Sequence, residues 1–452
     1  MLEEESQLNA DLAAGFVADT GYDRLPDEVA AKAKRCLLDF LGVALSSSGL
    51  PAYQAGRELL EGFGDGGAAT VIGSGERLPL LAAVWANTLL GSVMDLEDGY
   101  YPSVGHPGSV VFPVTLAFAE HGRASGREFL AASVIGYEIC ARAGQAMTRF
   151  YRKRALGSGG SSVYGAAAAA SRLLGLDKRG VGLALGAAGV YMPSTPVHYS
   201  IDHQSMVKGG IPWGTFVGAS SALLARGGFA APPATMQDPF ADPEDPTARP
   251  IFQTLGSEWE IRKVYFKRYP SCRWTHAPLD AVLEIVAEHK LAAGEIDSVR
   301  IETFEEAARL DHGGPVTLEG FQFDIPYTVA AALVYGDFTV EQMTAETLQD
   351  PRVSQLARKV SLVADPELSA MFPVRRPARV TISLADGGEL SREVLNLHGE
   401  AGGDFETQGY LDKFIALASP RIGPEKCGQL IRTVEKLDRQ ESLDGLVSLL
   451  HE

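Results

Sequence analysis

The first 230 residues carry a succession of helical segments that are apolar on most of their faces. Residues 77–94, 112–122 and 126–148 are rich in small and aliphatic side chains, and residues 165–175 are mostly Ala, Leu and Gly. A surface helix needs only one apolar stripe, so helices that are apolar all round must be covered by other helices or by a second subunit. The pattern predicts a helical bundle with a central buried layer and further buried area for a partner subunit.

The composition changes at residues 227–250, where Gly, Pro and Asp cluster. Beyond this stretch, residues 296–304 and 378–384 alternate between apolar and polar side chains, which is the period of a half-buried strand. Asp-Gly-Gly at 386–388 is a favourable hairpin turn, and a further strand is expected at 390–395. Helical segments lie between the two alternating runs, so we expect this part of the chain to be α+β.

The length of 452 residues exceeds what one small core needs. At roughly 150 residues per domain, two domains are the safer expectation. We predict a mainly α fold with a large all-helical domain of residues 1–262, which residues 405–452 complete. A smaller α+β domain is expected at residues 263–404.

Charge and cysteine usage exclude several classes of protein. A formal net charge of −17 gives no basic footprint for nucleic acid or for an anionic membrane. The four cysteines are scattered without a CxxC pair, which argues against a disulfide scaffold or a thiolate metal site. The N-terminus lacks the features of a signal peptide, and the apolar stretches are too short and Gly-rich to span a bilayer. We expect a soluble, cytoplasmic protein that binds neither nucleic acid nor membrane.

An acidic run with a histidine follows the predicted helix at 77–94. Asp95, Glu97 and Asp98 crowd the end of this helix, where acids oppose the macrodipole. The functional interpretation makes Asp95 an orienting carboxylate and His106 a proton-transfer or substrate-binding imidazole. The alternative is a solvated acidic turn with an ordinary loop histidine. A metal site built from Asp95, Asp98 and His106 is only weakly indicated because there is no second histidine, so we predict none.

A second cluster is basic and lies just before a helix that starts near Pro278. Lys267, Arg268 and Arg273 stand among aromatic residues, and His276 lies at the helix N-terminus. Backbone N–H groups and the helix dipole favour an anion at that position, so we predict that this cluster binds a carboxylate. The alternative is a basic loop on an acidic protein.

Two further side chains are candidates from their surroundings. Lys208 is preceded by apolar residues and followed by two glycines, so it is either a base, an anion ligand or a lysine that reaches solvent. Tyr327 stands at the start of an apolar helix, where tyrosine is most often a packing residue. The Gly-rich run at 157–162 lacks the Lys-Ser/Thr ending of a P-loop and gives no support to nucleotide binding.

Seven segments in order resemble the MmgE/PrpD family, whose members include 2-methylcitrate dehydratase, cis-aconitate decarboxylase and iminodisuccinate epimerase. They are LLDFLGVALSS, the stretch from Asp95 to His106, PVTLAFAEHGRASG, YGAAAAASRLLGL, MVKGGIPWGTFVGASSALLARGGF, FKRYPSCRWTHAPLDA and DIPYTVAAAL. The resemblance implies a large helical domain completed by C-terminal helices and a smaller α+β domain, with the active site in the cleft between them. It also implies a homodimer and no metal or organic cofactor.

The same resemblance implies which residues line the active site. By position they are Asp95, His106, Lys208, His276 and Tyr327. Two positions depart from the family pattern. A histidine usual before the Ala-rich helix is missing here, with Leu156 or a nearby glycine or serine in its place, and Gly99 stands where a hydroxyl residue is common. The missing histidine argues against the dehydratase and decarboxylase activities.

Together these observations predict α-proton chemistry on a small di- or tricarboxylate. His106, Lys208 or Tyr327 is expected to exchange the proton, while Lys267, Arg268 and His276 hold carboxylates and stabilise the enolate-like charge. We expect a dehydratase-type lyase, the commoner outcome in the family, with an epimerase of an amino- or imino-dicarboxylate as the second possibility. The third is a non-catalytic carboxylate-binding homologue, whose candidate side chains would not converge.

Overall fold

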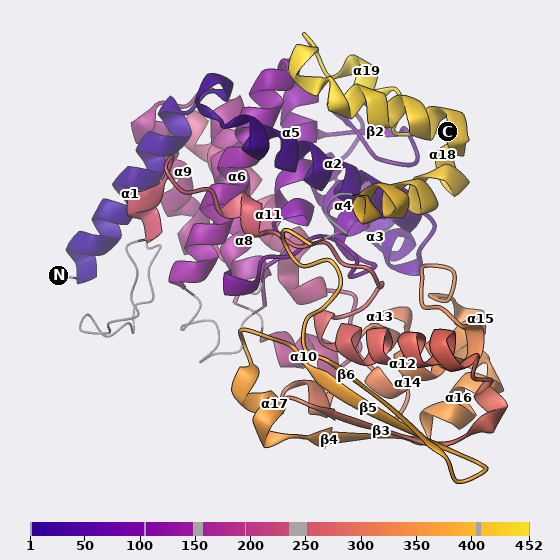
Figure 1. The fold of residues 1–452 in the computed structure, drawn as a ribbon. Coiled ribbons are helices and arrows are strands. Elements are labelled where there is room, and N and C mark those ends of the chain that lie inside the picture. Colours follow the sequence, from indigo (N-terminus) through magenta and orange to yellow (C-terminus); the bar gives the residue numbers. More distant parts are fainter. Residues whose placement is uncertain are drawn as a thin grey trace.

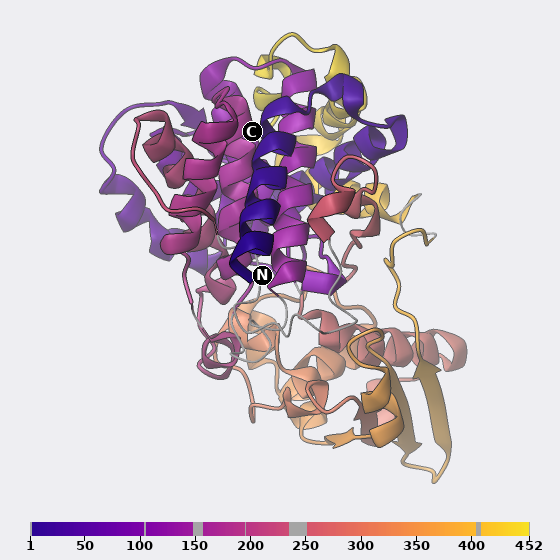
Figure 2. The same cartoon turned by 90° about the vertical axis from the view of Figure 1, so that its left-hand side faces the viewer.

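The computed structural model describes residues 2–103, 105–147, 157–194, 196–234, 251–403 and 408–451. Two parts lie one above the other in both ribbon views (Figures 1 and 2). The upper part is helical, and the lower part combines helices with a sheet. The predicted class, mainly α with a smaller α+β part, is confirmed.

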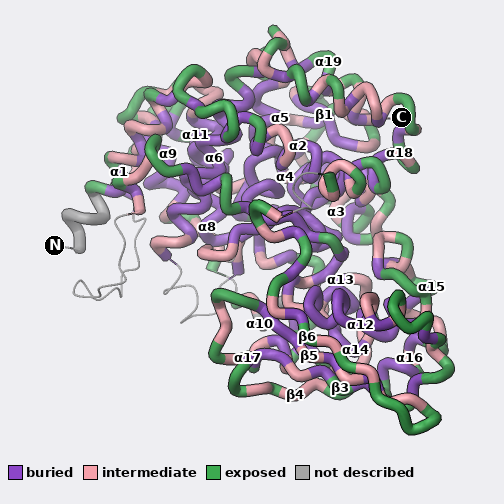
Figure 3. The backbone as a smooth tube through the Cα atoms, in the orientation of Figure 1, coloured by how far each residue is buried: buried purple, intermediate pink, exposed green. Residues whose placement is uncertain are grey.

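The centre of the helical part consists of α4 (Leu80–Ser92), α5 (Pro107–Gly122), α6 (Gly126–Ala146), α8 (Gly159–Leu173) and α11 (Ile211–Arg226). Most residues of these helices are buried, and the buried trace fills the middle of the bundle (Figure 3). The small residues of α8 and α11 allow their backbones to meet. A Cβ atom on Gly214 would lie 2.0 Å from the carbonyl oxygen of Gly159. The apolar runs in the sequence therefore form the predicted buried layer.

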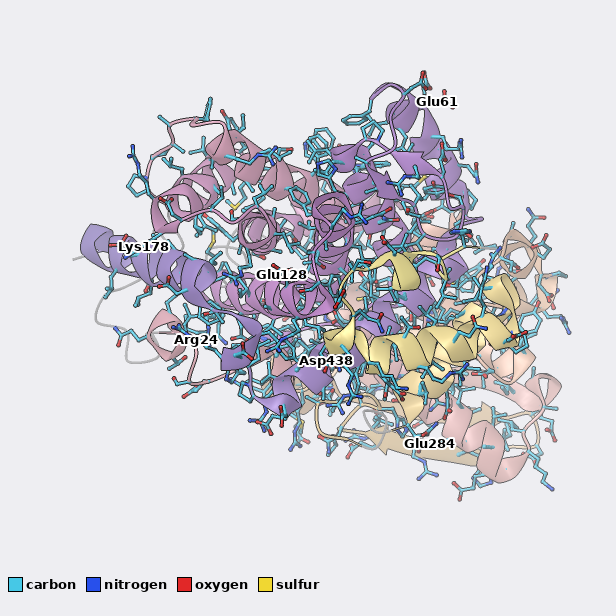
Figure 4. All side chains as sticks on the ribbon, turned by 90° about the horizontal axis from the view of Figure 1, so that it is seen from above. Arg24, Glu61, Glu128, Lys178, Glu284 and Asp438 are labelled. Carbon is cyan, nitrogen blue, oxygen red and sulfur yellow. The ribbon has the colours of Figure 1, made fainter. Side chains whose placement is uncertain are left out.

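Outer helices surround this layer. They are α1 (Leu2–Asp19), α2 (Asp27–Ser47), α3 (Pro51–Glu61), α9 (Lys178–Val190) and α18 (Gly409–Glu435). The C-terminal helix α18 returns to the helical part and packs along α2 (Figure 1). Exposed charged side chains such as Arg24, Glu61 and Lys178 lie around the rim of this part (Figure 4). The expectation of an all-helical domain was wrong in one detail, because a two-residue ribbon pairs β1 (Ala69–Thr70) with β2 (Arg77–Leu78).

The lower part contains a four-stranded sheet in the order β4-β3-β5-β6. Strand β3 (Ile296–Thr303) pairs antiparallel with β5 (Ala378–Leu384), which continues through a tight turn into β6 (Glu389–Val394). These are the strands and the hairpin that alternation and the Asp-Gly-Gly turn predict. Strand β4 (Val360–Ala364) pairs parallel with β3 and was not expected.

Helices cover the side of this sheet that faces the helical part (Figure 1). Helix α12 (His276–His289) packs on β5 and β6, and α14 (Ile325–Tyr335) packs on α12 and β4. The short α13 (Leu318–Phe321) and α16 (Pro351–Ala357) complete the layer. The N-terminal ends of α12 and α14 bring polar residues near the helical part.

Length and apolar character decide whether a helix can cross a bilayer. Within the described ranges, no single helix combines the two, although α2 and α3, bent by 89°, meet the requirement as a pair.

Candidate active site

The loop after α4 carries its acids inward. Helix α4 ends at Ser92, and Asp95 adopts the left-handed conformation with φ of 50°. Asp95, Glu97 and Asp98 are all buried. A solvated acidic turn would leave these carboxyl groups in water, so that alternative is wrong. Three buried carboxyl groups in four residues require partners from other parts of the chain.

Lys267 is the main partner of Asp95. Its Nζ atom donates to Oδ1 of Asp95 at 2.7 Å and to the backbone oxygen of the same residue at 2.8 Å, and the ammonium group is buried. Burial alone would raise the pKa of Asp95, but the charges of Lys267 and Lys208 lower it below the ordinary value. Asp95 is therefore ionised, and this pair joins the helical part to the α+β part.

His106 stands at the N-terminus of α5 with its ring against the acidic loop. Its Nδ1 lies 3.0 Å from the backbone oxygen of Asp98, which can only accept, so Nδ1 carries the proton. Nε2 has no hydrogen-bond partner among the residues that the structure describes. Burial and the charge of Lys267 lower the pKa of His106 to about 4. The ring is thus a neutral imidazole with the lone pair of Nε2 available as a base.

Asp98 has a structural role, because both of its carboxyl oxygens bind other groups of the protein. Its Oδ1 accepts from the backbone N–H of Gly108 at 2.8 Å, and its Oδ2 accepts from the hydroxyl of Tyr137 at 2.6 Å. These bonds hold the first turn of α5, and with it His106, against the loop. Burial raises the pKa of Asp98 to about 7.

Glu97 differs from its neighbours because both of its carboxyl oxygens are buried without a hydrogen-bond partner in the described part of the chain. Oδ2 of Asp95 has the same status. The nearest basic group is Nδ1 of His106, 3.8 Å from Oε1 of Glu97. Burial, together with the charge of Asp95, raises the pKa of Glu97 to about 8. Buried polar atoms without partners mark a place that a ligand or water completes.

Lys208 enters the same region from the segment before α11. Lys208, Gly209 and Gly210 all have positive φ, a bend that the two glycines permit. The Nζ atom donates to Oε1 of Gln322 at 2.5 Å and lies over the ring of Phe323. Lys208 is buried, so a lysine reaching into solvent is excluded. Its charge lowers the pKa values of Asp95 and His106, which places it within electrostatic reach of both.

The basic cluster before α12 divides into buried and exposed members. Nη1 of Arg273 lies 3.0 Å from Nδ1 of His276, which therefore accepts, and Nε2 of His276 faces the backbone oxygen of Ser271 at 3.4 Å. Burial and the charge of Arg273 lower the pKa of His276 well below its ordinary value. Both ring nitrogens are engaged, so His276 orients Arg273 in this state and does not present a free nitrogen.

Arg268 does not reach this region. Its side chain is 44% exposed, lies over the ring of Tyr269 and points to Asp280, 4.0 Å away. The predicted role of Arg268 in holding a carboxylate disagrees with this position. Arg273 is the buried arginine instead, bound to Tyr101, to the backbone oxygen of His398 and to Glu400.

Tyr327 lies in the first turn of α14. Its backbone N–H donates to Oδ1 of Asp324, and its ring packs edge-on against Phe321. Within the described ranges, no direct contact joins Tyr327 to the Asp95–His106 loop. Its role in proton exchange stays a prediction. Gln322, on the segment that precedes it, is the residue that contacts Lys208, and sequence reasoning did not single it out.

The two departures from the family pattern have different outcomes. Leu156 lies outside the described residues. At Gly99, an added Cβ would lie 2.3 Å from the ring of Tyr265, and the backbones of these two residues exchange hydrogen bonds at 3.0 and 2.9 Å. Tyr265 therefore occupies the space that a side chain at position 99 would need.

A metal ion has one geometrically possible place among the described residues. Ligand atoms of Asp95, Glu97 and His106 lie within 4.8 Å of one another. This trio contains Glu97 where the sequence suggested Asp98, whose oxygens are both occupied. Lys267 already binds Asp95, and its ammonium charge opposes a divalent cation.

Six side chains thus converge, five of them buried and His106 partly buried: Asp95, Glu97, His106 and Lys208 from the helical part, and Lys267 and Gln322 from the α+β part. They combine two ammonium groups, an ionised carboxylate, a neutral imidazole and a carboxyl group with a raised pKa. Such a set can bind an anion and move a proton.

Comparison with known proteins finds relatives that match nearly the whole chain. The chain is 25% identical to the cis-aconitate decarboxylase of Aspergillus terreus, over 96% of this chain and 94% of that protein. It is also 25% identical to human cis-aconitate decarboxylase, over 94% and 91% of the two chains. A cis-aconitate decarboxylase-like protein of Aspergillus oryzae is 26% identical over 99% and 98%. These similarities support an enzyme of the lyase type.

Family descriptions cover most of the chain. The MmgE/PrpD N-terminal domain matches residues 11–241, and the MmgE/PrpD C-terminal domain matches residues 269–439. The two matches run in the same order as the helical and α+β parts. The chain belongs to the MmgE/PrpD family.

Proposed function

We propose that this protein is a lyase that acts on a small di- or tricarboxylate by moving a proton at the carbon next to a carboxylate. The observation that carries the proposal is a neutral imidazole with a free Nε2, at His106, beside the ammonium groups of Lys208 and Lys267. Two ammonium groups against the one ionised carboxylate of Asp95 leave a local positive charge in an acidic protein. A small polyanion is the substrate that such a site favours.

The proposed division of labour depends on which atoms are free. Nε2 of His106 takes the proton from carbon. Lys208 uses one N–H on Gln322 and has two left to bind a carboxylate and the enolate-like charge that develops on it. Lys267 keeps Asp95 ionised. The ion pair of Lys267 and Asp95, and not a metal ion or an organic cofactor, is proposed to supply the fixed charges of the site.

The fate of the enolate-like intermediate decides the product. Proton removal followed by loss of hydroxide as water makes a dehydratase. A decarboxylase instead releases carbon dioxide, and the electron pair left on carbon takes up a proton. The names of the relatives favour a tricarboxylate of the cis-aconitate kind and a lyase outcome. Return of the proton to the other face, as in an epimerase of an amino- or imino-dicarboxylate, is the second candidate, because Glu97 offers a second acid–base group beside His106.

We also propose that substrate enters between the two parts of the molecule, since each contributes side chains to the cluster. All four cysteines are free thiols, which supports the expectation of a reducing, cytoplasmic setting.

A homodimer is proposed from the distribution of apolar surface. Of the fourteen large apolar side chains that are exposed in the described part of the chain, eight lie between residues 190 and 229. They belong to α9, to α11, to the segment between these helices and, for Phe229, to the residues just after α11, and the two helices pack against each other. A concentration of exposed apolar residues marks a surface that a second subunit covers.

The test of the function is hydrogen exchange at carbon. The protein is incubated in D2O with citrate, methylcitrate, cis-aconitate and iminodisuccinate in turn, and C–H exchange, alkene formation and carbon dioxide release are followed by NMR. His106→Gln is expected to abolish exchange. His121→Gln is the matched control, because His121 lies exposed in the last turn of the same helix α5. Equal exchange in both variants overturns His106 as the base, and scrambling of configuration without elimination favours the epimerase.

A further inference from the structure

Glu97 is the one acid of the cluster whose negative charge no neighbour stabilises directly. Its side chain is 1% exposed, and neither oxygen has a hydrogen-bond partner among the described residues. An ionised carboxylate has about four lone-pair sites to satisfy, whereas a protonated one needs mainly an acceptor for its O–H. Leaving the ionised form buried without bonds carries a large desolvation cost. The surroundings therefore favour the acid form.

The cations nearby make their hydrogen bonds to groups other than Glu97. Lys267 binds Asp95, Lys208 binds Gln322, and Lys413 of α18 binds Asp39 and the backbone oxygen of Leu96. Asp95 itself is a negative charge next to Glu97, and two carboxylates that share a site do not both ionise readily. Lys267 selects Asp95 as the ionised member. Glu97 is left as the member that keeps the proton, in line with its raised pKa.

We propose that Glu97 is a further catalytic residue, a buried carboxylic acid that gives its proton to the substrate; in a dehydration, His106 takes a proton from the substrate as well. This inference rests on the proposed function. Two features support a place in the reaction: the 3.8 Å separation between Oε1 of Glu97 and Nδ1 of His106, and the unpartnered Oδ2 of Asp95 in the same cluster.

The proton balance can be written for either lyase outcome. In a dehydration, His106 removes the proton from carbon, the C–O bond breaks, and the O–H of Glu97 supplies the proton that turns the departing hydroxide into water. The enzyme is left with an imidazolium and a carboxylate, and one proton passed between them restores both groups. In a decarboxylation, His106 removes no proton. Carbon dioxide leaves, the electron pair of the broken C–C bond takes the proton of Glu97, and solvent returns one to the carboxylate.

Glu97→Gln separates the chemical role from a packing role. Glutamine keeps the size, the neutral charge and a hydrogen-bond donor of the protonated acid, but it has no proton to give. We expect the variant to fold with an unchanged unfolding midpoint and to keep substrate binding by calorimetry. Its turnover is expected to fall by about 10²- to 10⁴-fold, the usual contribution of a general acid or base.

Infrared spectroscopy reports the protonation state without turnover. The carbonyl stretch of a protonated carboxyl group should be present in the unaltered protein at pH 7, be lost in Glu97→Gln, and titrate away as pH rises through about 8. Glu138→Gln is the matched control. Glu138 is a buried glutamate with a pKa raised by burial to about 7, bound to the backbone N–H groups of Glu260 and Ile261 and paired with Arg142, which keeps Glu260 as a second counter-charge. This variant should keep the band of Glu97 and the activity.

The outcomes divide cleanly. Full turnover in Glu97→Gln, or no carbonyl band lost in that variant, overturns the role of Glu97 while leaving the lyase proposal intact. No exchange and no turnover by the unaltered protein with any of the four carboxylates overturns the proposed function, and the catalytic role of Glu97 falls with it. A lower turnover in Glu97→Gln together with loss of the band supports the inference.

Discussion

The ammonium group of Lys267 lies 2.7 Å from Oδ1 of Asp95, and the two residues are 172 positions apart in the sequence. Asp95 comes from the loop after α4 of the helical part, and Lys267 from the segment that leads to α12. Both side chains are buried. One ion pair thus connects the two parts of the molecule at the candidate active site and sets the charge of the groups around it.

Breaking this pair should destabilise the fold. Asp95→Asn leaves the ammonium group of Lys267 buried without a counter-charge, and we expect a loss of about 3–5 kcal/mol in the free energy of unfolding, measured with urea. The control is Glu305→Gln, which removes an exposed ion pair with Arg309 and should cost less than ~1 kcal/mol. A loss in Asp95→Asn no larger than in the control would show that the pair does not hold the two parts together.

The sequence allowed much of the fold to be predicted because the decisive signals are local. Small and aliphatic residues in long runs identify helices that pack closely, as α8 and α11 do. Alternation and the Asp-Gly-Gly turn identify β3 and the β5–β6 hairpin. Strand β4 was not predicted. It lies at the edge of the sheet and pairs in parallel with β3, so no short hairpin turn next to it in the sequence indicates the pairing.

Asp95, His106, Lys208 and Lys267 were each predicted as site residues from their local surroundings, but the sequence does not show how these separate segments come together. Asp95 and His106 share one loop, and local charge identified both. Lys267 and Arg268 look alike in sequence, yet Lys267 is turned inward and its neighbour is turned to the surface. Which of two adjacent basic residues faces inward depends on tertiary packing. Gln322 is uncharged, so no charge pattern in the sequence points to it. That both carboxyl oxygens of Glu97 lack a hydrogen-bond partner among the described residues can be seen only in the three-dimensional structure.

Metal removal tests whether the ammonium group of Lys267, and not a metal ion, supplies the positive charge beside Asp95. Because its ammonium group binds Asp95, we expect dialysis against a chelator to leave C–H exchange unchanged. Residual metal content is checked by elemental analysis, and Lys267→Met serves as a comparison in which the opposing charge is gone. Loss of exchange that one added divalent ion restores would mean that Asp95, Glu97 and His106 hold a metal.

Stability should fall as pH rises from about 6.5 to 8. Burial raises the pKa of Asp98 and Glu138 to about 7 and that of Glu97 to about 8. A carboxyl group with a raised pKa in the folded state binds more protons there than in the unfolded chain, so its contribution is lost as pH increases through the folded value. The lowered pKa of His106 makes stability rise with pH, but only between about pH 4 and pH 6.5.

The expected fall over this window is on the order of 2 kcal/mol, since each pKa unit corresponds to about 1.4 kcal/mol. Urea unfolding at half-unit steps of pH measures it. Glu97→Gln should reduce the slope between pH 7 and 8, where Glu97 is the last of the three to ionise. A flat or rising profile would contradict the protonated state of these buried carboxyl groups.

Arg268 and Arg273 provide a paired comparison within the basic cluster. Arg268→Lys changes a half-exposed side chain and should alter kcat/KM by no more than about twofold, the size of an ordinary surface substitution. Arg273→Lys keeps the charge but loses the planar guanidinium group that binds Tyr101, His276 and Glu400. This variant should therefore have a lower thermal stability, and its kcat/KM should fall by at least tenfold. Equal effects, measured by steady-state kinetics and calorimetry, would restore Arg268 as a substrate ligand.

The oligomeric state tests the apolar surface between residues 190 and 229. Trp213, in the first turn of α11, is 49% exposed, so a charged residue there would be buried without a partner in a dimer that covers this helix. Trp213→Glu is expected to shift the protein from dimer to monomer in sedimentation velocity. Leu59→Glu is the control, because Leu59 is 40% exposed on α3, outside this surface. A monomeric unaltered protein at every concentration, or dissociation of both variants alike, would refute this surface as the dimer interface.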